Sequence, residues 1–139
     1  MLRQLLLGGG VSLINITIHA LVMTSIVKIA RSKSARKRTR PYLLLIAVII
    51  PTVSVLMMAH ALEVIVWSLA YLMVDAVPVG AGRIYFAFVN YTTLGYGDIV
   101  PVQRWQLLGP ITAMNGVLLF GWSTAVIFEV LRRTLERMP

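Results

Sequence analysis

Three long apolar runs limit what this chain can fold into more than any other feature of its sequence. They extend over residues 5–29, 42–74 and 105–130. An apolar run of about 18 residues or more is long enough to cross a bilayer as a helix. Because 58% of the chain is hydrophobic and little of it lies outside these runs, we expect an all-α membrane protein with three transmembrane helices and no soluble domain.

The basic residues indicate how these helices are oriented. The net charge is +8, and most basic residues lie either in the connector between the first two runs or after the third. Basic residues beside membrane spans favour the cytoplasmic side, so we predict an extracytoplasmic N-terminus and a cytoplasmic C-terminus in a multi-pass protein of the cell (plasma) membrane. The connector at residues 31–40 either binds anionic lipid or serves topology alone, and a cluster that flanks a membrane span gives no reason to expect a nucleic-acid partner. The residues concerned are Lys28, Arg31, Lys33, Arg36, Lys37, Arg38, Arg40, Arg132, Arg133 and Arg137.

The first two runs each have an irregular feature. Asn15 and His19 help to make the first run the most polar of the three, so a helix lying along the membrane surface is an alternative to a span. The second run is longer than a bilayer requires, which predicts a tilt or a bend at Pro51. Near the outer end of that run, Trp67 and Tyr71 suit the headgroup region, and helix packing explains them as well.

A shorter apolar segment, residues 83–92, lies between the second and third runs and is too short to cross a membrane. We expect it to be a re-entrant helix, followed by a turn-forming stretch that contains Gly95 and Gly97. Non-helical backbone at membrane depth is tolerated only where it is buried in protein or lines a water-filled path. The sequence therefore predicts a pore.

The stretch after this short helix reads Thr92, Thr93, Leu94, Gly95, Tyr96, Gly97 and Asp98, and it closely resembles the selectivity-filter signature of potassium channels. With the flanking helices, residues 42–132 resemble the pore domain of the bacterial-like members of that family. The resemblance implies a potassium-selective channel that conducts K+ passively, assembled as a homotetramer because one subunit has a single pore loop. It divides the chain into residues 1–40, an additional N-terminal transmembrane helix with the basic connector, and residues 41–139, the pore domain of outer helix, pore helix, filter and inner helix.

The residue types of this signature also suit a potassium filter on physical grounds. Rings of backbone carbonyls replace the water around a dehydrated cation without placing full charges in its path. Carbonyls that point the same way require positive φ at alternate residues, and Gly95 and Gly97 adopt it at little cost. K+, the only cofactor expected, would bind at the carbonyls of Thr93, Leu94, Gly95 and Tyr96, with the Thr93 hydroxyl below them. No organic cofactor is expected.

The residues around the filter are expected to support it. By the resemblance, Tyr96 and the pair Tyr85 and Phe86 brace the filter from behind, where many family members have a tryptophan pair. Thr92 ends the pore helix, whose dipole directs partial negative charge toward the pore. Asp98 follows the filter as in the family, and capping a helix or a turn near the outer mouth is an equally good explanation of it.

Two residues of the third run are candidates for gating. Gly116 falls close to the gating hinge of the family, although close helix packing explains a glycine there as well. Glu129 either contributes to an acidic ring at the inner mouth or forms a salt bridge to Arg132 or Arg133 at helical spacing, and the salt bridge is favoured.

His60 and Glu63 lie within the second run, where ionisable residues are costly and therefore suspected of function. Their spacing places them on one helical face, which we expect to turn toward the pore helix or the first span. The pair is either a proton-sensitive switch or a hydrogen-bonded contact that fixes the outer helix against the pore, and the second interpretation is favoured.

Two other functions remain alternatives: a cation channel with poor selectivity, and a non-conducting component such as an accessory subunit or a transporter fragment. The intact Gly95, Tyr96 and Gly97 argue against the first. An enzyme is not expected, because no nucleophile, base and orienting residue occur together. The chain has no cysteine, and its two histidines are too far apart in sequence to form a metal motif by spacing.

Overall fold

The computed structural model describes residues 1–33 and 41–136, and the side chains of residues 1–28 and 42–136. It contains three long helices, α1 (Leu2–Lys33), α2 (Pro41–Met73) and α4 (Leu108–Leu135). Between α2 and α4 lie the short helix α3 (Arg83–Tyr91) and a single 3-10 turn, η1 (Gln103–Trp105). The described part of the chain has no strand, which confirms the expected all-α class.

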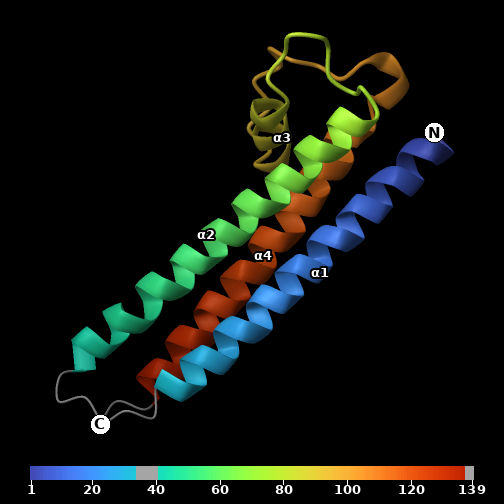
Figure 1. Cartoon of the computed structure of the whole chain (residues 1–139). Coiled ribbons are helices and arrows are strands. Elements are labelled where there is room, and N and C mark those ends of the chain that lie inside the picture. Colours follow the sequence, from blue (N-terminus) through green and yellow to red (C-terminus); the bar gives the residue numbers. More distant parts are fainter. Residues whose placement is uncertain (34–40, 137–139) are drawn as a thin grey trace.

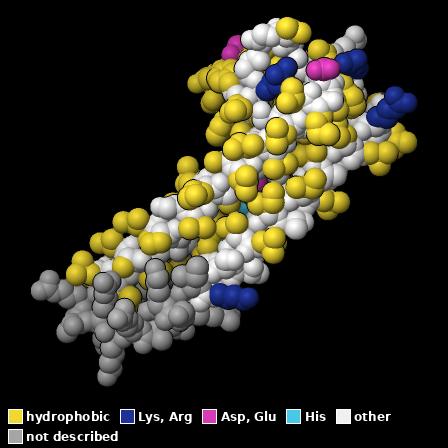
Figure 2. Space-filling model, in the orientation of Figure 1, with side chains coloured by type: hydrophobic (Ala, Val, Ile, Leu, Met, Phe, Trp, Pro, Cys, Tyr) yellow, Lys and Arg dark blue, Asp and Glu magenta, His cyan; other side chains and the backbone are white. Residues whose placement is uncertain are grey.

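The three long helices lie side by side, with α1 and α4 running in one direction and α2 in the other (Figure 1). The N-terminus is therefore at the same end of the bundle as α3. All three are long and apolar enough to cross a membrane, over Leu2–Lys28, Tyr42–Met73 and Gln103–Leu135, within a few residues of the expected runs. Figure 2 shows hydrophobic side chains along the length of one face of the bundle and basic side chains near the ends of the bundle. This distribution suits a protein embedded in lipid.

Helix α1 packs against the other long helices at both of its ends. At the end near α3, Gln4 Oε1 accepts a hydrogen bond from the Leu107 backbone N–H (2.8 Å), and a Cβ at Gly8 would lie 2.9 Å from the Ile111 side chain. At the other end α1 joins α2 and α4 in a buried apolar cluster. Its members are Met23, Ile26, Val48, Leu56 and Val130. This alignment supports the spanning interpretation of α1, since a helix lying on the membrane surface would cross the bundle steeply.

The end of α2 near α3 contributes to the main apolar core. Trp67 and Tyr71 are completely buried there. Trp67 Nε1 donates to Asn115 Oδ1 (3.0 Å), and the Tyr71 hydroxyl lies 2.5 Å from Thr112 Oγ1. Both polar groups have partners inside the protein, so these rings pack helices together, and their place at the depth of the headgroup region stays a prediction. Helix α2 passes through Pro51 without interruption, and a bend there stays a prediction.

Candidate functional site

Helix α3 is a short amphipathic helix that anchors the loop after it. Its bounds agree with the predicted segment 83–92, and it packs on α2 and α4 without running the length of the bundle (Figure 1). The buried side consists of Phe86, Ala87, Val89 and Tyr91. Because this side is held in the core, the C-terminal end of α3 fixes the position from which the loop starts.

The end of α3 is closed by a left-handed residue. The Leu94 N–H donates to the Val89 carbonyl (2.9 Å), and the Thr93 N–H donates to the Asn90 carbonyl (3.0 Å). These two bonds form a Schellman motif, in which the residue just past the helix takes positive φ and is usually glycine. Here it is Thr93, with φ 60°. A residue with a Cβ is disfavoured in this conformation by roughly 1–2 kcal/mol, so the surrounding contacts must hold it in place.

Positive φ recurs at every second residue of the loop. Thr93 has φ 60°, Gly95 62° and Gly97 75°, whereas Leu94 and Tyr96 between them do not have positive φ. The two glycines confirm the backbone prediction. The left-handed Thr93 was missed, because threonine gives no local signal for positive φ. Such an alternation is what a row of carbonyls facing one side requires.

The side chains of the loop are mostly uncovered within one subunit. Leu94 is 53% exposed and Tyr96 67%, and the Thr93 hydroxyl donates to the adjacent Thr92 carbonyl (2.6 Å). The bracing role expected for Tyr96 therefore stays a prediction about the assembled protein.

The pair Tyr85 and Phe86 divides between the two sides of α3. The Tyr85 hydroxyl donates to Asp98 Oδ2 (2.8 Å), so the start of the pore helix is tied to the residue after the loop, and this bond raises the pKa of the Tyr85 hydroxyl. Within the described residues the only side-chain partner of the Asp98 carboxylate is this hydroxyl, and its explanation as a cap stays a prediction. Phe86 instead packs into the core, with its ring 5.1 Å from that of Tyr71, and so supports the loop only through α3.

The two gating candidates have structural partners. A Cβ at Gly116 would overlap the Tyr91 backbone carbonyl, so the close-packing explanation of this glycine is supported and its hinge role stays a prediction. Glu129 pairs with Arg132 at 3.0 Å and contacts Arg133 closely. The favoured salt bridge is thus confirmed, and an acidic ring at the inner mouth stays a prediction.

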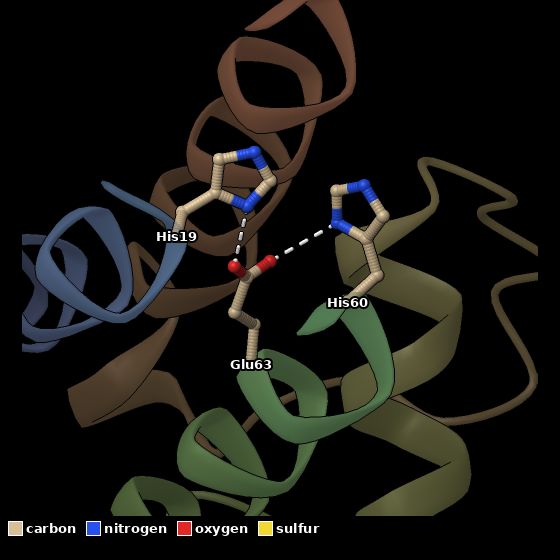
Figure 3. Close-up of side chains that lie close together, drawn as sticks. All are labelled: His19, His60 and Glu63. Carbon is tan, nitrogen blue, oxygen red and sulfur yellow. Dashed lines mark hydrogen bonds and ion pairs between the residues drawn. The ribbon is translucent and has the colours of Figure 1, made fainter. Parts of the chain in front are cut away.

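His60 and Glu63 turn toward protein, as expected, and meet a second histidine that the sequence did not connect with them. His19 Nδ1 lies 2.7 Å from Glu63 Oε1, and His60 Nδ1 lies 3.0 Å from Glu63 Oε2 (Figure 3). The Tyr91 hydroxyl of α3 donates to Glu63 Oε2, and Ser123 Oγ of α4 lies 2.9 Å from His60 Nε2 and 3.3 Å from His19 Nε2. We call these five residues the polar cluster. It joins α1, α2, α3 and α4.

A second set of buried polar contacts lies one helical turn away. Asn15 Nδ2 donates to Asn115 Oδ1 (3.1 Å) and to the Glu63 backbone carbonyl (3.2 Å). Asn15 and His19 are four residues apart on one face of α1. That spacing was the available sign that this face turns toward protein, since polar groups in a span avoid lipid. Polar contacts therefore attach α1 to the pore domain midway along its length.

These features define a pore-loop membrane protein: two long apolar helices, a short helix between them, and a loop of alternating left-handed residues. The family model described as "Ion channel" matches residues 43–133, which extend from α2 to α4. The chain therefore belongs to this ion channel family. Comparisons with curated proteins and with solved structures gave no match. Helix α1 lies outside the matched region, as does the expected lipid site at residues 31–40, whose side chains are outside the described part of the chain.

Proposed function

We propose that this protein is the subunit of a homotetrameric, potassium-selective channel that conducts K+ passively across the cell membrane. The observation that carries this proposal is the alternation of positive φ at Thr93, Gly95 and Gly97. It occurs directly at the end of a short helix that does not span the bundle. A backbone of this form suits stacked carbonyl sites, which replace the hydration shell of K+.

The exposed loop side chains support a fourfold assembly. A carbonyl row on one subunit lines only one side of an ion path, so other subunits must supply the remaining sides. Leu94 and Tyr96 are largely uncovered in the single subunit, and hydrophobic and aromatic side chains at that depth need a protein partner. Copies of the same chain around a central axis provide both the missing carbonyls and the missing packing.

Purified protein in liposomes tests the proposal directly. We expect K+ or Rb+ flux far above Na+ flux, and native mass spectrometry should show a tetramer in the conducting sample. Equal K+ and Na+ permeability would favour the poorly selective cation channel, and no flux from a correctly assembled tetramer would favour a non-conducting component.

The glycine pair Gly97 and Gly80 offers a matched mutational test of the filter. Both have positive φ, 75° and 86°, and a Cβ at either would meet no atom within 4 Å. Alanine therefore brings a similar backbone cost at both positions. We expect Gly97→Ala to lose selective conduction and Gly80→Ala, in the outer connector, to keep it. Equal behaviour of the two variants would show that the loop backbone is not the filter.

A further inference from the structure

Every histidine of the chain lies in the polar cluster. The sequence contains two histidines and no cysteine, and the fold brings His19 and His60 to the same carboxylate although 44 positions separate His19 from Glu63. His19 and Glu63 are completely buried, and His60 is 8% exposed. Both imidazoles of a chain that has no thiol are thus gathered at one buried place.

The contacts of the polar cluster form a closed ring. On one side the two Nδ1 atoms face the two oxygens of Glu63, at 2.7 and 3.0 Å. On the other side the two Nε2 atoms face a single oxygen, Ser123 Oγ, at 3.3 and 2.9 Å. Tyr91 closes the carboxylate side, because its hydroxyl donates to Glu63 Oε2 and lies 3.0 Å from His60 Nδ1.

This ring is short of one positive charge when both histidines are neutral and Glu63 is ionised. Each imidazole then has one N–H, and both are used on the carboxylate. Both Nε2 atoms become acceptors that face one Ser123 hydroxyl, which has a single hydrogen to donate. One of the two Nε2 contacts with Ser123 is therefore left without a hydrogen. The buried carboxylate is also left without a counter-charge, and both defects are costly in an apolar interior.

A metal ion between the Nδ1 atoms and the carboxylate satisfies every one of these groups. Both Nε2 atoms then carry hydrogen, and Ser123 Oγ has two lone pairs to accept them, as is usual for the second nitrogen of a histidine that binds metal. The candidate ligand atoms of His19, His60 and Glu63 lie within 4.8 Å of one another. Tetrahedral zinc with bonds of 2.0–2.2 Å separates its ligands by about 3.3 Å, so small outward shifts open the site.

We propose that His19, His60 and Glu63, with Tyr91 as fourth ligand, form a zinc site that ties α1 to α2 and to the pore helix. Imidazole and carboxylate are ligands that zinc prefers. Binding of Zn2+ would release the Tyr91 hydroxyl proton to water and move the proton of each histidine from Nδ1 to Nε2. The Tyr91 phenolate and the Glu63 carboxylate then balance the charge of Zn2+, so the site is neutral within the bundle. The inference does not depend on which ion the pore conducts.

Because the chain contains only two histidines and no cysteine, few other side chains compete for zinc in the test. The full protein is purified with an affinity tag that contains no histidine or cysteine, and its zinc content is measured by mass spectrometry of the metal. We expect about one ion per chain, and Co2+ substituted for Zn2+ should give the visible absorption bands of a tetrahedral site. Zinc should also raise the melting temperature of the protein, and a strong chelator should lower it.

Variants separate this site from adventitious binding. His19→Gln, His60→Gln and Glu63→Gln should each reduce zinc to background, whereas Glu136→Gln, at an exposed carboxylate, should not. Tyr91→Phe should keep Co2+ but shift its bands, because one ligand is replaced. Wild-type protein with neither stoichiometric zinc nor a tetrahedral Co2+ spectrum would overturn the proposal, even if some variants fail to fold, and would leave a proton as the missing positive charge.

Discussion

The backbone carbonyl of Tyr91 lies against Gly116, with no room for a side chain between them. Helix α4 approaches the end of the pore helix this closely only because residue 116 lacks a Cβ. Gly116 thereby fixes the distance between α4 and the end of α3, from which the loop at residues 93–97 starts.

Replacing Gly116 with alanine should disturb this contact. Alanine favours a helix over glycine by up to about 1 kcal/mol, but overpacking a close contact costs roughly 1–3 kcal/mol. We expect Gly116→Ala to lower the thermal stability of the assembly and its ion flux. Gly121→Ala, whose Cβ would meet no atom within 4 Å, is the matched control and should be neutral or stabilising. A Gly116→Ala variant of normal stability with altered opening would favour the hinge instead.

Replacing Glu63 with glutamine should weaken the attachment of α1 and α3 to α2. Glutamine keeps the size of the side chain but replaces one of the two oxygens that face the histidines and Tyr91 with an NH2 group, and leaving a buried polar group without its partner costs about 1–3 kcal/mol. We expect a lower melting temperature and a weaker tetramer, with ion selectivity unchanged. Glu129→Gln, at a partly exposed ion pair, should change stability much less. Loss of a pH-dependent current with assembly intact would point to the proton-sensitive switch.

The Tyr85 hydroxyl should stay protonated to a higher pH than an ordinary tyrosine. Its hydrogen bond to Asp98 raises its pKa above the usual value of 10.0. The bond therefore contributes throughout the neutral range and is lost only as the pH rises through the raised pKa. The difference between the tyrosinate absorbance titrations of wild type and Tyr85→Phe should have its midpoint above 10. Tyr42→Phe, at an exposed residue, is the control, and a Tyr85 midpoint at or below 10 would contradict the bond.

The N-terminus should be extracytoplasmic, on the same side as the filter. The chain has no native cysteine, so single cysteines report topology without background. Gln4 is buried and bonded to the start of α4, which makes exposed Arg3 the better position. Arg3→Cys should react with a membrane-impermeant reagent added outside intact cells, and Ser34→Cys should react only after permeabilisation. The reverse pattern would invert the predicted topology.

Hydropathy was sufficient for the long helices, because a bilayer demands long apolar runs whatever their partners are. The glycines of the loop were likewise predictable, since few residues other than glycine tolerate positive φ. The left-handed conformation of Thr93 was not predictable, because it comes from the two hydrogen bonds that close α3 and not from the preference of threonine itself.

The contacts between helices were the least predictable part. The spacing of His60 and Glu63 showed that they share a face, but the rotation of α1 that brings His19 to the same carboxylate depends on packing along the whole helix. Trp67 and Tyr71 illustrate the same limit. An aromatic residue with a polar group suits both a membrane interface and a satisfied core, and the sequence does not identify the partners Asn115 and Thr112 that these two residues have in the core.

Thr93 is both the residue that closes α3 and the first left-handed residue of the loop. The end of the helix therefore determines which later residues of the loop are left-handed. Inserting or deleting a residue between Thr93 and Gly95 would put Gly95 and Gly97 out of phase with the left-handed positions, and this loop should not tolerate the changes in length that ordinary loops accept. The connector between α2 and α3 is different, because Val79 is fully exposed and Gly80 has open space around it. Length variation among homologues and inserted epitopes should therefore be found or accepted at residues 79–80.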